Sequence, residues 1–211
     1  KGELGWLSVK GDPRISAITR TVQSCLRSTK GVDRIVGRVY AFLEDPAWSI
    51  SFLDERDAAG VEDVNGKLVR PFIMLVLLTD GSYEIEDSVV GYMIIVHGAF
   101  GTRAVCRWRC TGMKASATSS THVETYGLDF GSRDYLPAFA LFTKLVGATQ
   151  ARVYTDSSSA LLAVRRGFSK RMQFIAGERV LLGNTRTAAA NKATEGRLAW
   201  LSATVGDVSE W

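Results

Sequence analysis

PFIMLVLLTDGSYEIEDSVVGYMIIV, residues 71–96, is the stretch that decides the fold. It contains two apolar runs, 72–78 and 89–96, which are separated by Thr-Asp-Gly-Ser and a short acidic turn. The first run is too short to span a membrane and is bounded by turn residues, so it predicts a buried central strand. The second run predicts the antiparallel partner of that strand.

Asp80 stands at the carboxyl end of the predicted central strand. A carboxylate at the mouth of a buried strand is costly unless a partner compensates its charge, and a divalent cation is one such partner. However, Asp80 is followed by Gly81, and Asp-Gly is a common signal for a hairpin turn. This stretch by itself therefore leaves two interpretations open, a functional carboxylate and an ordinary turn residue.

The composition is ordinary for a soluble globular protein, with 46% hydrophobic and 23% charged residues in a chain of 211. No stretch is long and apolar enough to span a bilayer, and no signal peptide opens the chain. The first residue is Lys, which suggests a piece of a longer polypeptide or a processed product. The net charge of +4 is compatible with nucleic-acid binding without being diagnostic of it.

Three cysteines, an odd number, argue against a disulfide framework and predict an intracellular, reducing compartment. Two of them, Cys106 and Cys110, have no nearby His or Cys pair, so a zinc site is not expected.

Residues 1–68 are expected to form an N-terminal appendage, and residues 69–211 the main domain. In the appendage, Asp12-Pro13 predicts the start of a basic amphipathic helix that ends at Lys30-Gly31. Two strands and a surface loop are expected after it, at 36–42, 48–53 and 54–67.

The main domain changes from strand to helix patterns after the first hairpin. Further strands are predicted at 104–109, 113–119, 151–155 and 197–203, and helices after Ser119 and at 157–166 and 169–182. Pro137 is expected to kink or split the first of these helices. The expected fold class is α/β, with a mixed sheet in which an antiparallel meander is followed by parallel strands, and with helices on its faces.

Three acidic residues share a setting in this arrangement. Asp80 and Asp156 end two strands that are expected to run parallel, and Glu124 lies in the first turns of the crossover helix between them. Groups at the carboxyl ends of adjacent strands converge on one crevice, where clustered carboxylates need cations to stay ionised. Oxygen ligands select Mg²⁺ or Mn²⁺, and two such ions about 4 Å apart support phosphodiester cleavage.

The motifs around these acids resemble those of the ribonuclease H domain of copia-type retrotransposon polyproteins. Thr-Asp80-Gly-Ser, with Gly-Tyr opening the next strand, resembles the first motif, and Thr-Asp156-Ser before an Ala-Leu-rich helix resembles the third. Between them, a Trp, a basic stretch and Ser-Ser-Thr-His-Val-Glu124 resemble the second. The chain departs from the family at His122, where the family has Glu, and at Thr125, where it has Tyr.

The resemblance covers most of residues 14–211 and implies a ribonuclease H-like fold with two metal ions. It implies catalytic and metal-binding roles for Asp80, Glu124 and Asp156. The family's fourth acid should follow the last strand, which makes Asp207 the best candidate and Glu210 the fallback, although the family's usual ending is absent. His122 is expected to be a surface residue.

Two groups of basic residues are candidates for contacts with nucleic-acid phosphates. They are Arg107 and Arg109 in one strand, and Arg165, Arg166, Lys170 and Arg171 after Asp156. For the first group, structural ion pairs are an equal alternative, and for the second, a solvated face.

The resemblance implies endonucleolytic hydrolysis of the RNA strand of RNA·DNA hybrids. Expected partners are such hybrids or structured RNA, within a larger polyprotein or ribonucleoprotein assembly, and no membrane. The main alternative is a catalytically inactive ribonuclease H-like module with a structural or RNA-binding role, which the departures at His122 and Thr125 favour. Another nuclease on the same fold, such as a junction resolvase, is a third and weaker alternative.

Overall fold

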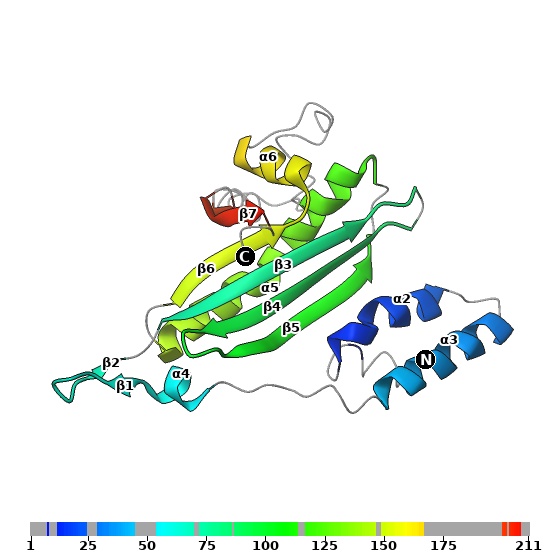
Figure 1. Cartoon of the computed structure of the whole chain (residues 1–211). Coiled ribbons are helices and arrows are strands. Elements are labelled where there is room, and N and C mark those ends of the chain that lie inside the picture. Colours follow the sequence, from blue (N-terminus) through cyan, green and yellow to red (C-terminus); the bar gives the residue numbers. More distant parts are fainter. Residues whose placement is uncertain are drawn as a thin grey trace.

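The architecture is organised around one mixed sheet, seen in the computed structural model of the chain (Figure 1). The structure describes residues 8, 12–24, 29–44, 54–69, 72–85, 87–113, 117–146, 149–166, 200–201 and 203–207. The predicted strand at 48–53 and the predicted helix at 169–182 lie outside these residues. Among the described residues, no helix is long and apolar enough to cross a membrane.

The sheet has five strands in the order β5-β4-β3-β6-β7. Their bounds are β3 Ile73–Ser82, β4 Val89–Gly98, β5 Arg103–Gly112, β6 Thr149–Thr155 and β7 Val205–Asp207. β3, β4 and β5 form an antiparallel meander, whereas β6 pairs with β3 and β7 with β6 in parallel. The predicted α/β class and mixed sheet are therefore confirmed.

β3 is the central strand because both of its faces are apolar. Leu75 and Leu77 lie in the main core, whereas Val76 lies in a smaller cluster on the other face with Ile95 and Tyr154. All three β3 residues are fully buried. A strand that is covered on both faces has an unbroken apolar sequence, which is the pattern that the sequence shows at 72–78.

Two helices cover one face of the sheet. α5 (Ser120–Val146) and α6 (Ser158–Arg166) contribute Leu128, Tyr135 and Leu161 to the main core. The buried Tyr135 hydroxyl donates to the Leu75 carbonyl at 2.5 Å and accepts the Arg152 N–H at 3.3 Å. This hydroxyl ties the helix to β3 and β6 at once.

The described residues up to Glu44 are mostly helical. η1 (Pro13–Ile15) and α2 (Ser16–Ser24) follow Asp12, whose side chain caps them as predicted, and α3 is Thr29–Leu43. α2 packs beside β5 (Figure 1), and Ile15 packs against Val39 of α3. A short helix α4 (Glu55–Ala59) and a hairpin of β1 (Val61–Glu62) and β2 (Leu68–Val69) come next.

Several predicted elements differ from the structure. The expected strand at 36–42 is wrong because 36–42 belong to α3, whose partly apolar face includes Val36 and the buried Val39. For the same reason the helical region does not end at Lys30-Gly31. In 54–67, α4 and β1 replace the expected surface loop. These segments are short, or their apolar and polar residues alternate only weakly. Tertiary packing rather than hydrophobic periodicity therefore decides their structure.

The C-terminal half contains three more differences. Met113 and 117–119 are not in a strand, because β5 ends at Gly112. Pro137 lies inside α5 and does not split it, so of its two expected effects only the kink stays a prediction. Residues 200, 201, 203 and 204 are helical rather than extended, and the last described strand is β7, so the expected strand at 197–203 is wrong in its described part. Leu201 joins the main core, which explains its apolar character without a strand.

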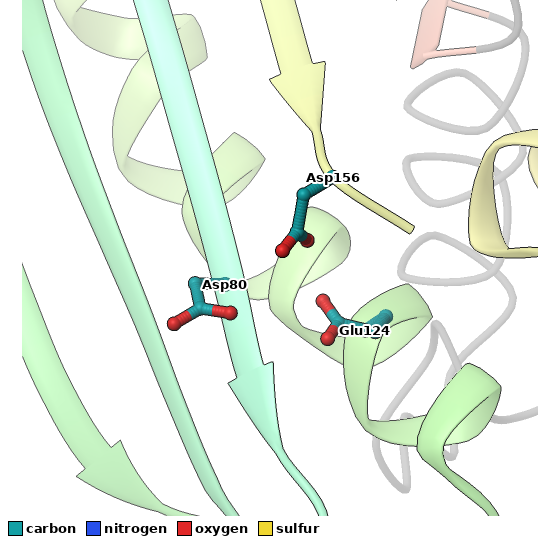
Figure 2. A group of neighbouring side chains, drawn as sticks. All are labelled: Asp80, Glu124 and Asp156. Atoms are coloured by element: carbon teal, nitrogen blue, oxygen red, sulfur yellow. The ribbon is translucent and has the colours of Figure 1, made fainter. Parts of the chain in front are cut away.

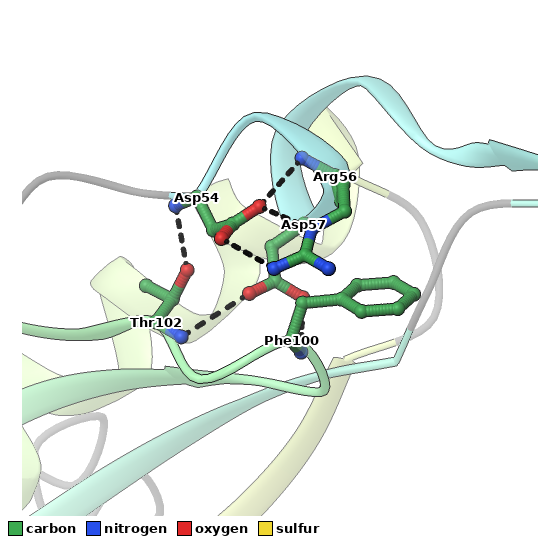
Figure 3. A network of polar contacts seen from close by, with 5 residues as sticks. All are labelled: Asp54, Arg56, Asp57, Phe100 and Thr102. Atoms are coloured by element: carbon green, nitrogen blue, oxygen red, sulfur yellow. Dashed lines mark hydrogen bonds and ion pairs between the residues drawn. The ribbon is translucent and has the colours of Figure 1, made fainter.

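A buried carboxylate attaches α4 to the end of the β4–β5 hairpin (Figure 3). Asp57 is 2% exposed and accepts the Phe100 N–H at 3.1 Å and the Thr102 N–H at 3.3 Å. A Cβ at Gly98 would lie 2.2 Å from the Asp57 carboxylate, so glycine is needed there. The Arg56 guanidinium stacks 4.8 Å from the centre of the Phe100 ring.

Asp57→Ala is expected to lower the free energy of unfolding by about 2–4 kcal/mol, because it removes the acceptor of two N–H groups, that of Thr102 in a buried hydrogen bond and that of Phe100 in a partly buried one. Asp63→Ala is the matched control, since Asp63 also accepts two backbone N–H groups, those of Asn65 and Lys67, but both of these hydrogen bonds are exposed to solvent. There water replaces the lost acceptor, and the cost should stay below about 1 kcal/mol. Urea unfolding measures both values, and equal costs would contradict the role given to burial.

Candidate metal centre

Asp80 lies near the carboxyl end of β3, but it does not begin a turn. Gly81 and Ser82 continue the strand and pair with Val90 and Val89 of β4. The interpretation of Asp80 as a hairpin turn residue is therefore wrong. The Gly81 N–H donates to Asp80 Oδ1 at 2.8 Å, which fixes one carboxylate oxygen in place.

Asp156 and Glu124 join Asp80 from two other elements (Figure 2). Asp156 directly follows β6, and Thr155 pairs with Thr79 across the parallel strands, so the two aspartates end neighbouring strands at one sheet edge. Glu124 is in the first turns of α5. One carboxylate oxygen from each of the three residues lies within 4.8 Å of the others. The structure thus brings together the three acids that the sequence singled out.

Glycines allow α5 to come close enough to place Glu124. A Cβ at Gly81 would lie 2.9 Å from Val123 Cγ1 and 3.2 Å from the Glu124 nitrogen. In the helix, Gly127 and Gly131 face the strands, and a Cβ at Gly127 would lie 3.6 Å from the Asp80 carbonyl oxygen. The sequence analysis missed these positioning residues, although two glycines four apart in a helical stretch are a detectable signal.

The three carboxylates repel one another, and Glu124 shows the effect. Burial first, and then the charges of Asp156 and Asp80, raise the pKa of Glu124 to about 7, while the Gly81 N–H acts in the opposite direction. Glu124 is 8% exposed, and its Oε2 is buried without a hydrogen-bond partner. An unpartnered oxygen inside a group of acids fits a divalent cation, because hard cations take carboxylate oxygens as ligands.

The stability of the metal-free protein is expected to fall as the pH rises from about 4.5 to 7. In this range Glu124 keeps its proton in the folded protein and loses it in the unfolded protein, so a rise in pH lowers the free energy of the unfolded state relative to the folded state. The loss should be on the order of 1–3 kcal/mol. Urea unfolding in EDTA measures it as the difference from Glu124→Gln, which cannot titrate. A pH profile that is identical in both proteins would contradict this prediction.

His122 is not a surface residue, so that prediction is wrong. Its side chain is 5% exposed, and its Nδ1 lies 3.2 Å from the Thr118 backbone N–H, which donates to it. The ring therefore binds the segment that leads into α5. Burial lowers the pKa of His122, so its neutral form is favoured.

Asp207 ends β7 in register with Thr155, at the same sheet edge as Asp156 but one strand further out. It is not a member of the acidic group found among the described residues. Its role as fourth acid stays a prediction. Glu210 lies outside the described residues.

The basic candidates have varied surroundings. Arg107 forms an ion pair with Asp134 of α5 at 3.0 Å, and Arg109 lies 5.3 Å from the centre of the Phe130 ring. Arg165 donates to the Val205 carbonyl at 3.1 Å, and Arg166 is exposed. Lys170 and Arg171 lie outside the described residues. Their contacts with nucleic acid stay predictions.

No protein-family model matches the chain, and no curated protein matches it. Solved structures of ribonuclease H domains do match. The N-terminal RNase H domain of a Mycobacterium tuberculosis protein, solved as a fusion with maltose binding protein, has 20% identity, covers 64% of this chain and 82% of its own, and has a TM-score of 0.38. RNase H1 of Halobacterium salinarum has 11% identity, coverage of 64% and 85%, and a TM-score of 0.35.

A third structure is LC11-RNase H1 in complex with an RNA/DNA hybrid, with 14% identity, coverage of 64% and 83%, and a TM-score of 0.33. These are distant structural similarities to ribonuclease H domains. The antiparallel meander followed by parallel strands agrees with the ribonuclease H-like sheet that the sequence motifs implied. The fold is ribonuclease H-like, while an origin in a copia-type element stays a prediction.

Proposed function

We propose that this protein is a ribonuclease H-type endonuclease that hydrolyses the RNA strand of RNA·DNA hybrids with the help of Mg²⁺ or Mn²⁺. The observation that carries the proposal is the convergence of Asp80, Glu124 and Asp156 within 4.8 Å, with a buried and unpartnered oxygen on Glu124. The sequence motifs around these residues are those that resemble ribonuclease H.

The three acidic residues are positioned by different elements, two by strands and one by a helix. Asp80 and Asp156 stand at the ends of two paired strands, so the sheet fixes their separation. Glu124 comes from a helix that is held against β3 at Gly81, which lets its carboxylate approach theirs. All three would hold the cations, and Asp207 is the proposed fourth ligand.

Divalent cations bound by these carboxylates would activate a water molecule and stabilise the leaving oxygen of the phosphodiester. Without cations, Glu124 would be largely protonated below about pH 7, because burial and the two aspartates raise its pKa. Cation binding therefore requires Glu124 to release its proton, and the pKa of the group favours this at mildly alkaline pH.

The test is cleavage of an RNA·DNA hybrid labelled at the 5′ end of its RNA strand, in Mg²⁺, Mn²⁺ or EDTA. We expect internal cleavage of the RNA with either cation and none in EDTA. Single-stranded RNA, double-stranded RNA and a four-way DNA junction are the comparison substrates, because a junction resolvase would prefer the last. Absence of cleavage in a protein with a cooperative unfolding transition would overturn the proposal in favour of an inactive ribonuclease H-like module.

A further inference from the structure

Arg20 of α2 lies at the same end of the sheet as the acidic triad. Its Nη2 is 2.9 Å from Asp87 Oδ1, in the turn between β3 and β4. A Cβ at Gly112 would lie 2.4 Å from the same Nη2, so the guanidinium rests on the glycine that ends β5. The Arg20 side chain keeps 26% of its surface exposed. It is therefore fixed at two points and remains accessible from solvent.

One face of the sheet connects Arg20 to Asp80. Asp80 pairs with Gly91, and Gly91 with Cys110, so these three residues form one row across β3, β4 and β5. Cys110 and Gly112 lie on the same face of β5, since they are two residues apart. Gly91 has no side chain, and a Cβ there would meet only the Arg109 carbonyl oxygen, at 3.7 Å. No side chain of this row stands between Asp80 and Cys110.

The thiol of Cys110 lies within electrostatic range of both charged groups. Burial raises its pKa most, the Arg20 charge lowers it, and the Asp80 charge raises it. Adjacent strands are about 4.8 Å apart, so the two strand spacings from β3 to β5 place the cation on the order of 10 Å from the acids. Two small residues, Gly91 and Cys110, thus separate Asp80 from the strand end at which Arg20 lies.

We propose that Arg20 binds a backbone phosphate of the hybrid, next to the phosphate that is cleaved at the acidic triad. This inference rests on the proposed function. A planar guanidinium with free N–H donors suits a phosphate, and Asp87 holds it in place without consuming all five donors. α2 would then be part of the substrate-binding surface, although it precedes the main domain in the sequence.

The alternative is that Arg20 serves only as a structural ion pair between α2 and the hairpin, and two substitutions separate these roles. Arg20→Gln removes the cation, whereas Asp87→Asn breaks the ion pair but keeps the cation. If Arg20 binds phosphate, Arg20→Gln should weaken hybrid binding about fivefold and reduce the slope of log K against log[salt] by about 0.9, while Asp87→Asn should preserve or strengthen binding. If the pair is only structural, both variants should weaken binding alike.

Binding is measured by fluorescence anisotropy with a labelled RNA·DNA hybrid in Mg²⁺, on an Asp156→Asn background that prevents cleavage. Arg34→Gln and Asp33→Asn make the same charge changes at exposed positions of α3 and are the controls for general electrostatics. In the active protein, Arg20→Gln should raise KM and leave kcat within about twofold. Arg20→Lys, which keeps a charge, should bind better than Arg20→Gln even if the latter folds poorly.

Two kinds of failure can be told apart. If the parent protein neither binds nor cleaves the hybrid, the proposed function is wrong and the role of Arg20 falls with it. If the parent binds and cleaves but Arg20→Gln behaves like Arg34→Gln, or Asp87→Asn loses as much affinity as Arg20→Gln, only the phosphate-binding role of Arg20 is overturned.

Discussion

Asp156→Asn is expected to reduce Mg²⁺-dependent hybrid cleavage by about a thousandfold while making the metal-free protein more stable. The loss follows from removing a charged ligand from a group of three carboxylates. The gain follows because the Asp156 charge is one of the causes that raise the pKa of Glu124, so its removal relieves repulsion in the folded state. At pH 8 in EDTA the gain should be about 1 kcal/mol.

These opposite signs distinguish a functional group from a structural one. Replacing a carboxylate that stabilises the fold should make the protein less stable. Replacing one that is repelled by neighbouring carboxylates should make the protein more stable. Single-turnover cleavage and urea unfolding measure the two effects, and Mg²⁺ should raise the Tm of the parent protein but not of the variant. Asp33→Asn, an exposed acid on α3, is the control and should change neither quantity appreciably. A less stable Asp156→Asn would count against the metal centre.

The sequence was sufficient to predict the hairpin of β3 and β4, because their apolar runs are long and clearly bounded. It also located the three acids, because each follows from an element with a strong signal: Asp80 and Asp156 from strand ends, and Glu124 from a capped helix. Convergence was predictable because parallel strands have their carboxyl ends at one edge of the sheet.

Other features depend on contacts that no local pattern encodes. α3 contains Val36 and Val39, which a strand could also hold, and in the helix both pack with Ile15 of η1. The buried ring of His122 accepts a hydrogen bond from the backbone N–H of Thr118, and the sequence gives no local signal for this contact. The ion pair between Arg20 and Asp87 joins residues 67 apart in the sequence, so no local sequence pattern predicts it.

Gly131→Leu is expected to have the largest effect on stability, because α5 touches the sheet through this residue. A Cβ at Gly131 would lie 3.0 Å from Leu77 Cδ1, 3.1 Å from Tyr92 Cβ and 3.2 Å from Thr79 Cγ2. The outer atoms of a leucine would have to displace the helix or the strands. Overpacking on this scale should lower the free energy of unfolding by about 3 kcal/mol or more.

Gly37→Leu on α3 is the matched control, because nothing lies within 4 Å of a Cβ at that position. Leucine is the better helix former, so this variant should be more stable than the parent by about 0.5–1 kcal/mol. Since Glu124 lies two helical turns before Gly131, any Gly131→Leu protein that still folds should also lose the rise in Tm that Mg²⁺ causes. A variant with normal stability and a normal Mg²⁺ response would show that close approach of α5 does not position Glu124.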